Sequence, residues 1–294
     1  GGIVHDESAT GKTVFVEPSQ LVEVNNKIRE LEADERREII KILIETANFI
    51  RPHSEELLYS NHFLAETDAL RAKSIFSTKI GARLTQCVEK PFIEWKNAIH
   101  PLLLLSFKEL NKEENIVPLN ITLNEKQRIL LISGPNAGGK SVCIKTVGLL
   151  QYMWPCGLLI PALEDSVVGI FDNIFIDIGD EQSLENDLST YSSHLNNMKF
   201  FLKNGNHSTL LIIDEFGSGT EPLIGGAIAE AELNKFNQNK CFGVINTHYT
   251  NLKHFANHTE GVVNGAMLYD RHLMKPLFML SIGNPGSSFA VEIA

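Results

Sequence analysis

Cysteine is scarce in this chain of 294 residues, and none of it is paired in a recognisable pattern. The four cysteines, Cys87, Cys143, Cys156 and Cys241, lie far apart and form neither a C-x-x-C pair nor a metal-binding spacing. This spacing excludes a cysteine-based metal site and a disulfide framework, so we expect a protein of the reducing cytoplasm.

Long apolar runs are also missing. The longest, at residues 101–105 and 157–162, are far too short to cross a bilayer. The first residues lack the basic and apolar regions of a signal peptide. We therefore expect a soluble protein with no membrane partner. The abrupt start at Gly1 and stop at Ala294 suggests a fragment of a longer protein.

An excess of positive charge is the third absence. The net charge is −10, and residues 1–95 and 96–294 are each net negative. Since binding to a phosphate backbone needs clustered Lys and Arg, we expect these residues alone to bind nucleic acid weakly unless a local patch outweighs the overall field. What remains is an ordinary globular composition, 43% hydrophobic and 21% charged, enough for one large or two ordinary domains.

The first third of the chain predicts a hairpin followed by helices. Residues 3–17 alternate apolar and polar around a glycine-containing turn at 8–12, which is typical of a β-hairpin. Helical patterns then run from Ser19 to about Ile50 and from Ser54 to about Cys87. The simple interpretation is a helical hairpin that fills space, and the alternative is a lever that moves.

After a linker at residues 89–97, the pattern changes to strands separated by helices. Strands are predicted near residues 128–133, 174–178, 209–213 and 242–246, and their apolar character is typical of a parallel sheet covered on both faces. Residues 261–281 predict an antiparallel pair. We therefore expect an α/β domain over residues 96–294, preceded by a helical region over 1–95.

The sequence GPNAGGKS at residues 134–141 matches G-x-x-x-x-G-K-[ST] between a predicted strand and a predicted helix. Its glycines let backbone N–H groups form an anion cradle at a helix N-terminus, and the alternative is a glycine-rich turn without ligand. Lys140 is expected to neutralise the β- and γ-phosphates of ATP, and Ser141 to bind Mg²⁺. The predicted nucleotide contacts are Gly134, Pro135, Asn136, Ala137, Gly138, Gly139, Lys140, Ser141 and Val142.

Two acids follow the apolar strand at 209–213, as in a Walker B element. Asp214 is expected to hold Mg²⁺ through water, and Glu215 to orient and deprotonate the attacking water. Acidic pairs are common at sheet edges, so this interpretation depends on the combination with the glycine loop.

Two more polar residues follow predicted parallel strands, His248 after 242–246 and Gln182 after 174–178. Because ligands bind at the carboxyl ends of such strands, we expect His248 to reach a γ-phosphate oxygen and Gln182 to sense water or Mg²⁺. A structural histidine and an ordinary polar loop are the alternatives.

Five motifs, GPNAGGKS, DIGDEQS, STYSSH, IIDEFGSGTEP and NTHYTNLK, resemble in order and spacing the ATPase of the MutS family. The segments GIVHDESATGKTVFVEP and NNKIRELEADERREI resemble its second branch, which lacks the mismatch-recognition domain. The resemblance implies a P-loop NTPase of the ABC-ATPase type, preceded by a β-hairpin and a long helical hairpin. It also implies a homodimer with composite sites.

By that resemblance, Ser189 acts in trans on the γ-phosphate of a second chain, although a serine-rich helix start is first of all an N-cap. Ile116 stands where relatives of the first branch often place an aromatic ring against adenine, and we expect only an aliphatic contact. Residues 15–17 resemble the Phe-x-Glu that inspects mismatches, but only fourteen residues precede them, so we interpret them as hairpin packing. The family's C-terminal pairing helices and a nuclease-like module are absent from this sequence, so we expect no nuclease activity from it.

The function implied is Mg-dependent ATP hydrolysis, with the nucleotide state driving dimer and arm rearrangement on branched or recombining DNA or on stalled ribosomes. The alternative is a nucleotide-gated structural clamp related to chromosome-organising ABC proteins, with slow hydrolysis. A degenerate module that binds nucleotide without turnover is disfavoured, because the phosphate, metal and water-activating residues are all present.

Overall fold

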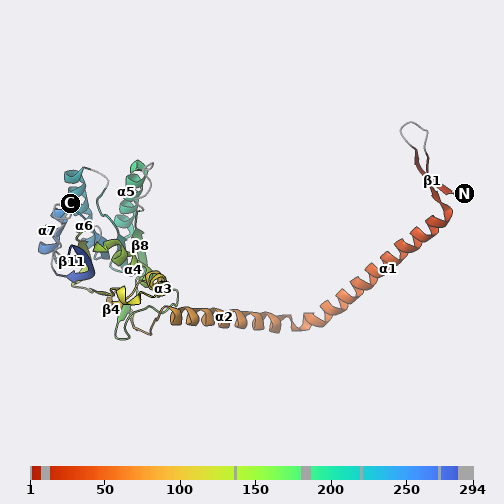
Figure 1. The fold of residues 1–294 in the computed structure, drawn as a ribbon, viewed down its shortest axis with the longest axis horizontal. Coiled ribbons are helices and arrows are strands. Elements are labelled where there is room, and N and C mark those ends of the chain that lie inside the picture. The colour runs from red at the N-terminus through yellow and green to blue at the C-terminus, as the bar shows by residue number, and fades with distance from the viewer. Residues whose placement is uncertain are drawn as a thin grey trace. The chain divides into compact units, whose positions relative to one another are not determined.

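The computed structural model describes residues 2–7, 14–135, 138–179, 187–218, 221–270 and 273–283 (Figure 1). Contacts divide the chain into two compact units, Gly1–Arg71 and Ala72–Ala294. Within the described ranges, every helix is too short or too polar to span a bilayer.

The first unit opens with a two-stranded antiparallel sheet of β1 (Gly2–Glu7) and β2 (Val14–Pro18). The register pairs Gly2 with Pro18 and Glu7 with Val14, with an irregularity between Val4 and Asp6. The turn expected at residues 8–12 lies outside the described residues, as do the side chains of residues 15–17.

Two long helices follow, α1 (Ser19–Ile50) and α2 (Ser54–Lys79), joined by the 3-10 turn η1 (Arg51–His53). Ile50 and Ser54 keep right-handed helical backbone angles on either side of η1, so the chain does not reverse there. The apolar seam of α1 stays 47–55% exposed at Leu21, Val24, Ile28 and Leu31. The packed helical hairpin expected from the sequence is therefore not formed, because no non-helical residues allow a turn between α1 and α2.

The second unit is built on a six-stranded sheet in the order β12-β11-β6-β10-β9-β8. The strands pair in parallel except for the edge strand β12, which is antiparallel to β11. Their bounds are β6 (Gln127–Ser133), β8 (Asn173–Asp177), β9 (Thr209–Ile213), β10 (Phe242–Asn246), β11 (Gly261–Asp270) and β12 (Lys275–Ile282). The predicted parallel sheet and the antiparallel pair are both confirmed.

Alternate residues of the central strands enter two separate cores, one on each face of this sheet. Leu130, Ile212 and Val244 pack with α4 (Lys140–Met153), whereas Leu131 and Ile213 pack with residues of α5 (Asp187–Asn204), α6 (Pro222–Gln238) and α7 (Thr250–His258). Since both faces are covered, strands such as β9 are completely buried, which explains why their sequences are apolar throughout.

A smaller four-stranded sheet, in the order β3-β7-β4-β5, adds to the core on the α4 side. It comprises β3 (Gln86–Val88), β4 (Ile93–Ala98), β5 (Leu119–Leu123) and β7 (Val167–Gly169), and α3 (Pro101–Glu109) and η2 (Glu113–Asn115) lie between β4 and β5 in the chain. The linker expected at residues 89–97 is therefore wrong, because most of β4 lies within it and Ile93 and Trp95 are buried. The expected boundary between residues 95 and 96 falls inside this strand.

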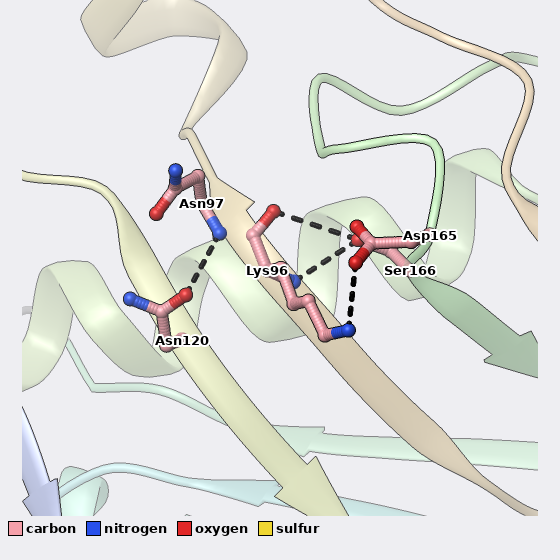
Figure 2. A network of polar contacts seen from close by, with 5 residues as sticks. All are labelled: Lys96, Asn97, Asn120, Asp165 and Ser166. Atoms are coloured by element: carbon pink, nitrogen blue, oxygen red, sulfur yellow. Dashed lines mark hydrogen bonds and ion pairs between the residues drawn. The ribbon is translucent and has the colours of Figure 1, made fainter.

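Polar contacts hold the end of β4 between β5 and the turn before β7 (Figure 2). The Lys96 amine donates to Asp165 at 2.7 Å, and the Lys96 backbone N–H donates to the Ser166 hydroxyl at 3.0 Å. On the other side, the backbone N–H of Asn97 donates to the side-chain oxygen of Asn120 at 2.9 Å. Asn97 has a positive φ of 49°, where β4 and β5 change register.

Candidate active site

The loop between β6 and α4 has the backbone that a phosphate cradle requires. Gly134 and Gly139 have φ values of 134° and 90°, which residues other than glycine rarely adopt. A Cβ added at Gly139 would lie 3.0 Å from the ring of Phe278, and one at Gly138 would lie 3.2 Å from Met267. The glycines are therefore needed both for the turn and for the close approach of β11 and β12. Asn136 and Ala137 lie outside the described residues.

Lys140 begins α4 and is almost completely buried, with 3% of its surface exposed. Its amine donates to the Gly134 carbonyl at 2.7 Å, so the positive charge of Lys140 lies against the glycine loop. No side chain caps the start of α4, so the positive end of a 14-residue helix faces the same loop. Ser141 and Val142, the next two residues, are exposed. This is a local concentration of positive potential suited to a phosphate group.

Asp214 and Glu215 follow β9, which is separated from β6 by β10 alone. Asp214 is buried, and its backbone N–H donates to the carbonyl of Asp177 at the end of β8, at 2.9 Å. Glu215 is partly exposed and has a φ of 53°, a left-handed conformation that costs a residue with a side chain roughly 1–2 kcal/mol. Strained backbone of this kind concentrates at functional sites.

Asn246, the last residue of β10, connects these two acids, a role that the sequence reasoning did not assign to it. Its amide group donates to the Asp214 carboxylate and accepts the backbone N–H of Glu215 at 2.7 Å. The sequence places Asn246 at the end of the strand at 242–246 and in the motif NTHYTNLK, without a role of its own. The available signal was its place at the carboxyl end of a central strand, where polar residues gather around ligands.

His248 lies just beyond Asn246 and is exposed. Between them, Thr247 is buried and bound to both neighbouring segments. Its backbone N–H donates to the Ile132 carbonyl of β6 at 3.2 Å, and its hydroxyl donates to the Phe216 carbonyl at 3.1 Å. The segment that carries His248 is thus anchored between the glycine loop and the turn at residues 214–216, which we call the acidic turn.

The described part of the structure does not include the side chains of two predicted site residues. Gln182 lies outside the described residues, and Ser189 lies in the first turn of α5, where only the backbone is described. Their predicted contacts stay predictions.

Ile116 lines a cavity of about 200 Å³ beside the start of α4. Val142 and Thr146 of α4 line it as well, together with the rings of His100, Phe107 and Phe278. The aliphatic contact of Ile116 with adenine stays a prediction, and aromatic rings lie beside Ile116 in the same cavity. Phe278 reaches the cavity from β12, where its φ is 54°, and no local sequence signal links it to Ile116.

Residues 130–294 match the family description "MutS domain V". This segment is more than half of the chain and begins within β6. The chain belongs to the MutS family.

Curated relatives support the same assignment along the whole chain. The endonuclease MutS2 of Caldanaerobacter subterraneus subsp. tengcongensis is 41% identical over 293 residues, and that of Finegoldia magna is also 41% identical over 293 residues. The endonuclease MutS2 of Geobacillus sp. is 40% identical over 294 residues. Each alignment covers 100% of this chain but only 36% of the relative, so the chain spans about a third of the length of these proteins. It contains the ATPase domain of a MutS-family protein.

Proposed function

We propose that this MutS-family chain binds Mg-ATP at the loop between β6 and α4 and hydrolyses it with the acids after β9. The observation that carries the proposal is the arrangement of charge at the carboxyl ends of adjacent parallel strands. The buried amine of Lys140 follows β6, the buried carboxylate of Asp214 follows β9, and Asn246 ends the strand between them.

The loop fits the phosphates of ATP. Gly134 and Gly139 supply the backbone angles of the turn, and the start of α4 presents backbone N–H groups without a capping side chain. Lys140 balances the charge of the β- and γ-phosphates, while backbone N–H groups at the start of α4 orient them.

The residues also fit a magnesium ion. Mg²⁺ in such sites takes few protein ligands, together with phosphate oxygens and water, and here the Ser141 hydroxyl and the Asp214 carboxylate are the two oxygen donors. When bound, Mg²⁺ neutralises charge that develops on the phosphate oxygens. Asn246 fixes one oxygen of Asp214 by hydrogen bonding, which leaves the other for the ion or its water.

Glu215 is the general base of the proposal. Its backbone is fixed by the 2.7 Å bond to Asn246, so its carboxylate follows Asp214 at a set angle and accepts a proton from the attacking water. His248 contacts a γ-phosphate oxygen, and Gln182 orients the water or the metal. The cavity beside Ile116 receives the adenine, with the Phe278 ring against it.

The complete site is a composite of two chains. Ser189 lies in the first turn of α5, which follows β8 at the edge of the sheet, and β10 and β9 separate β8 from β6. At about 4.8 Å per strand, β8 and β6 are about 14 Å apart. This separation supports the proposal that Ser189 acts on the γ-phosphate held by a second copy. The nucleotide state then drives rearrangement of the dimer and its helical arm on branched or recombining DNA or on stalled ribosomes.

Mixing of two inactive variants tests the proposal. Lys140→Ala should lose tight ATP binding, and Ser189→Arg should bind ATP without hydrolysing it. An equimolar mixture should regain turnover, because each heterodimer contains one site with both an intact loop and an intact Ser189. Turnover per chain should also rise with protein concentration, and Lys126→Ala, an exposed lysine before β6, serves as control. Concentration-independent turnover without rescue would overturn the composite site.

A further inference from the structure

A cluster of partly buried polar side chains joins α5 to the end of β8. His194 of α5 contacts the carboxylate of Asp177 through Nδ1, and the amide of Asn197 donates to the same carboxylate at 2.7 Å. The side chains of His194 and Asp177 are only 13% and 12% exposed. This cluster has no part in the chemistry described above.

The cluster contacts the acidic turn on two sides. The backbone carbonyl of Asp177 accepts the N–H of Asp214 at 2.9 Å, so one residue bonds both to α5 and to the proposed metal ligand. The His194 ring also lies edge-on to Phe216, with ring centroids 6.5 Å apart, and Phe216 directly follows Glu215. His194 therefore connects α5, the helix whose first turn contains Ser189, to the turn that carries Asp214 and Glu215.

This arrangement costs more free energy than packing of α5 alone would require. The Nε2 atom of His194 is buried and makes no hydrogen bond within the described part of the chain. On α6, burial raises the pKa of the Glu232 carboxyl above its usual range, and the nearby charge of His194 opposes that shift. An apolar side chain would avoid these costs, but it would not define the position of α5 relative to Asp177.

We propose that His194 is a positioning residue that sets the first half of α5, and with it Ser189, relative to the acidic turn of the same chain. The inference rests on the proposed composite site, in which Ser189 completes the site of a second chain. His194 thus makes the geometry supplied to one site depend on the acidic turn of the other.

The rest of the structure explains why the effect should fall on α5. The acidic turn keeps its bonds to Asn246 and to the Asp177 backbone when the imidazole is removed. The second half of α5 is held by apolar contacts, because Phe201 stacks on Phe175 at 5.1 Å and Met198 is completely buried. The first half loses its bond to Asp177 when His194 is replaced.

Three substitutions separate a hydrogen-bonding role from simple filling of space. In His194→Asn the amide nitrogen takes the place of Nδ1, so the donor to Asp177 is kept. His194→Gln moves the amide out to the position of Nε2, and His194→Leu removes it. His207→Leu is the matched control, since His207 is an exposed histidine in the loop after α5.

The first measurement is backbone amide hydrogen exchange in the intact protein. We expect exchange of residues 190–194 to become about tenfold faster in the Leu and Gln variants, the size of one lost hydrogen bond to a charged group, with near-normal values in the Asn variant. Residues 198–204 and β9 should keep their protection. Unchanged exchange in the Leu variant, or equal effects of Asn and Leu, would overturn the inference whether or not the composite site is correct.

The second measurement places His194→Leu in either chain of the mixed dimer described above. On the Lys140→Ala chain, which supplies Ser189 to the working site, it should lower turnover about tenfold with an unchanged KM for ATP. On the Ser189→Arg chain, which supplies the loop and the acids, it should have little effect. The reverse pattern would make His194 a support for the acidic turn and sink the proposal. If the parent mixture regains no turnover, the composite site fails first, and the exchange experiment alone decides on His194.

Discussion

The side-chain oxygen of Asn246 accepts the backbone N–H of Glu215 at 2.7 Å. The same amide donates to Asp214 through its nitrogen, so one residue at the end of β10 orients the proposed metal ligand and the proposed general base together. Both acids follow β9, and their geometry thus depends on a residue from the neighbouring strand.

Asn246→Ala tests this dependence. Removal of a preorganised amide that orients both acids should lower kcat about a hundredfold, while the affinity for ATP, set mainly by the loop and Lys140, stays within a fewfold. Steady-state kinetics together with a nucleotide-binding titration separate the two quantities. Asn234→Ala, at an exposed position of α6, is the control. A rise in KM without a fall in kcat would assign Asn246 to binding instead.

Glu215 offers a test in which stability and activity move in opposite directions. Glu215→Gly removes the carboxylate but suits the φ of 53°, and it keeps the backbone N–H that Asn246 accepts. Relief of about 1–2 kcal/mol of strain exceeds the roughly 0.5–1 kcal/mol entropic cost of glycine, so Tm should rise by about 1–4 °C in a domain of this size.

Hydrolysis should fall by at least about a hundredfold in both Glu215→Gly and Glu215→Gln, the usual size of a lost general base. Calorimetry and single-turnover hydrolysis provide the two readouts. A Gly variant that is less stable than wild type by more than the roughly 0.5–1 kcal/mol entropic cost of glycine would show that the left-handed backbone carries no strain. A Gln variant within a fewfold of wild type would show that another group activates the water.

Phe278 should contribute to recognition of the base. Because its ring lines the cavity with Ile116, Phe278→Ala should raise KM for ATP about tenfold, the usual cost of a lost aromatic stack on a base, with a smaller change in kcat. Met279→Ala, at a neighbouring position of β12 with 50% exposure that does not line the cavity, is the control. The measurement is KM for ATP and for GTP in each variant. Equal effects of Phe278→Ala and Met279→Ala would remove the ring from the nucleotide site.

Cys143 can be interpreted either as a thiol activated by the start of α4 or as a small core residue, and the structure favours the core residue. It is 5% exposed, and burial raises the pKa of its thiol to about 12. Thiol labelling near neutral pH should therefore modify the exposed Cys87 and Cys156 first and reach Cys143 slowly, at a rate insensitive to ATP. Fast labelling of Cys143 that ATP suppresses would contradict this.

The same shift predicts the sign of an alkaline effect on stability. A thiol whose pKa is raised by folding stabilises the native state below its unfolded pKa near 8.5, and this contribution is lost as pH rises towards 12. Cys143→Ala should therefore lose stability less steeply than wild type above about pH 9. Denaturant unfolding at a series of pH values gives the two slopes. Parallel slopes would show that Cys143 does not titrate on unfolding.

The sequence by itself determined the sheet, the loop and the acids. Residues such as 128–133 and 209–213 read as buried parallel strands because both of their faces must be apolar, and the spacing of glycines before Lys140 and Ser141 is a local property of the chain. The position of the two acids after β9 is also a local property of the chain, since the end of an apolar strand can be recognised without any knowledge of the neighbouring strands.

The tertiary structure decided what depends on contacts between distant segments. Asn246 became a partner of Asp214 and Glu215 only through the order of the strands, and Phe278 joined Ile116 only because β12 folds back beside the loop. β4 cannot be recognised from the sequence at residues 89–97, because its short pattern of buried residues arises only when β5 and β7 pair with it. The predicted helical hairpin is not formed because the local backbone conformation, and not a distant contact, decides the path of the chain at this point. The helical backbone continues through η1 at residues 51–53, and the apolar residues of α1 and α2 remain exposed instead of packing against each other.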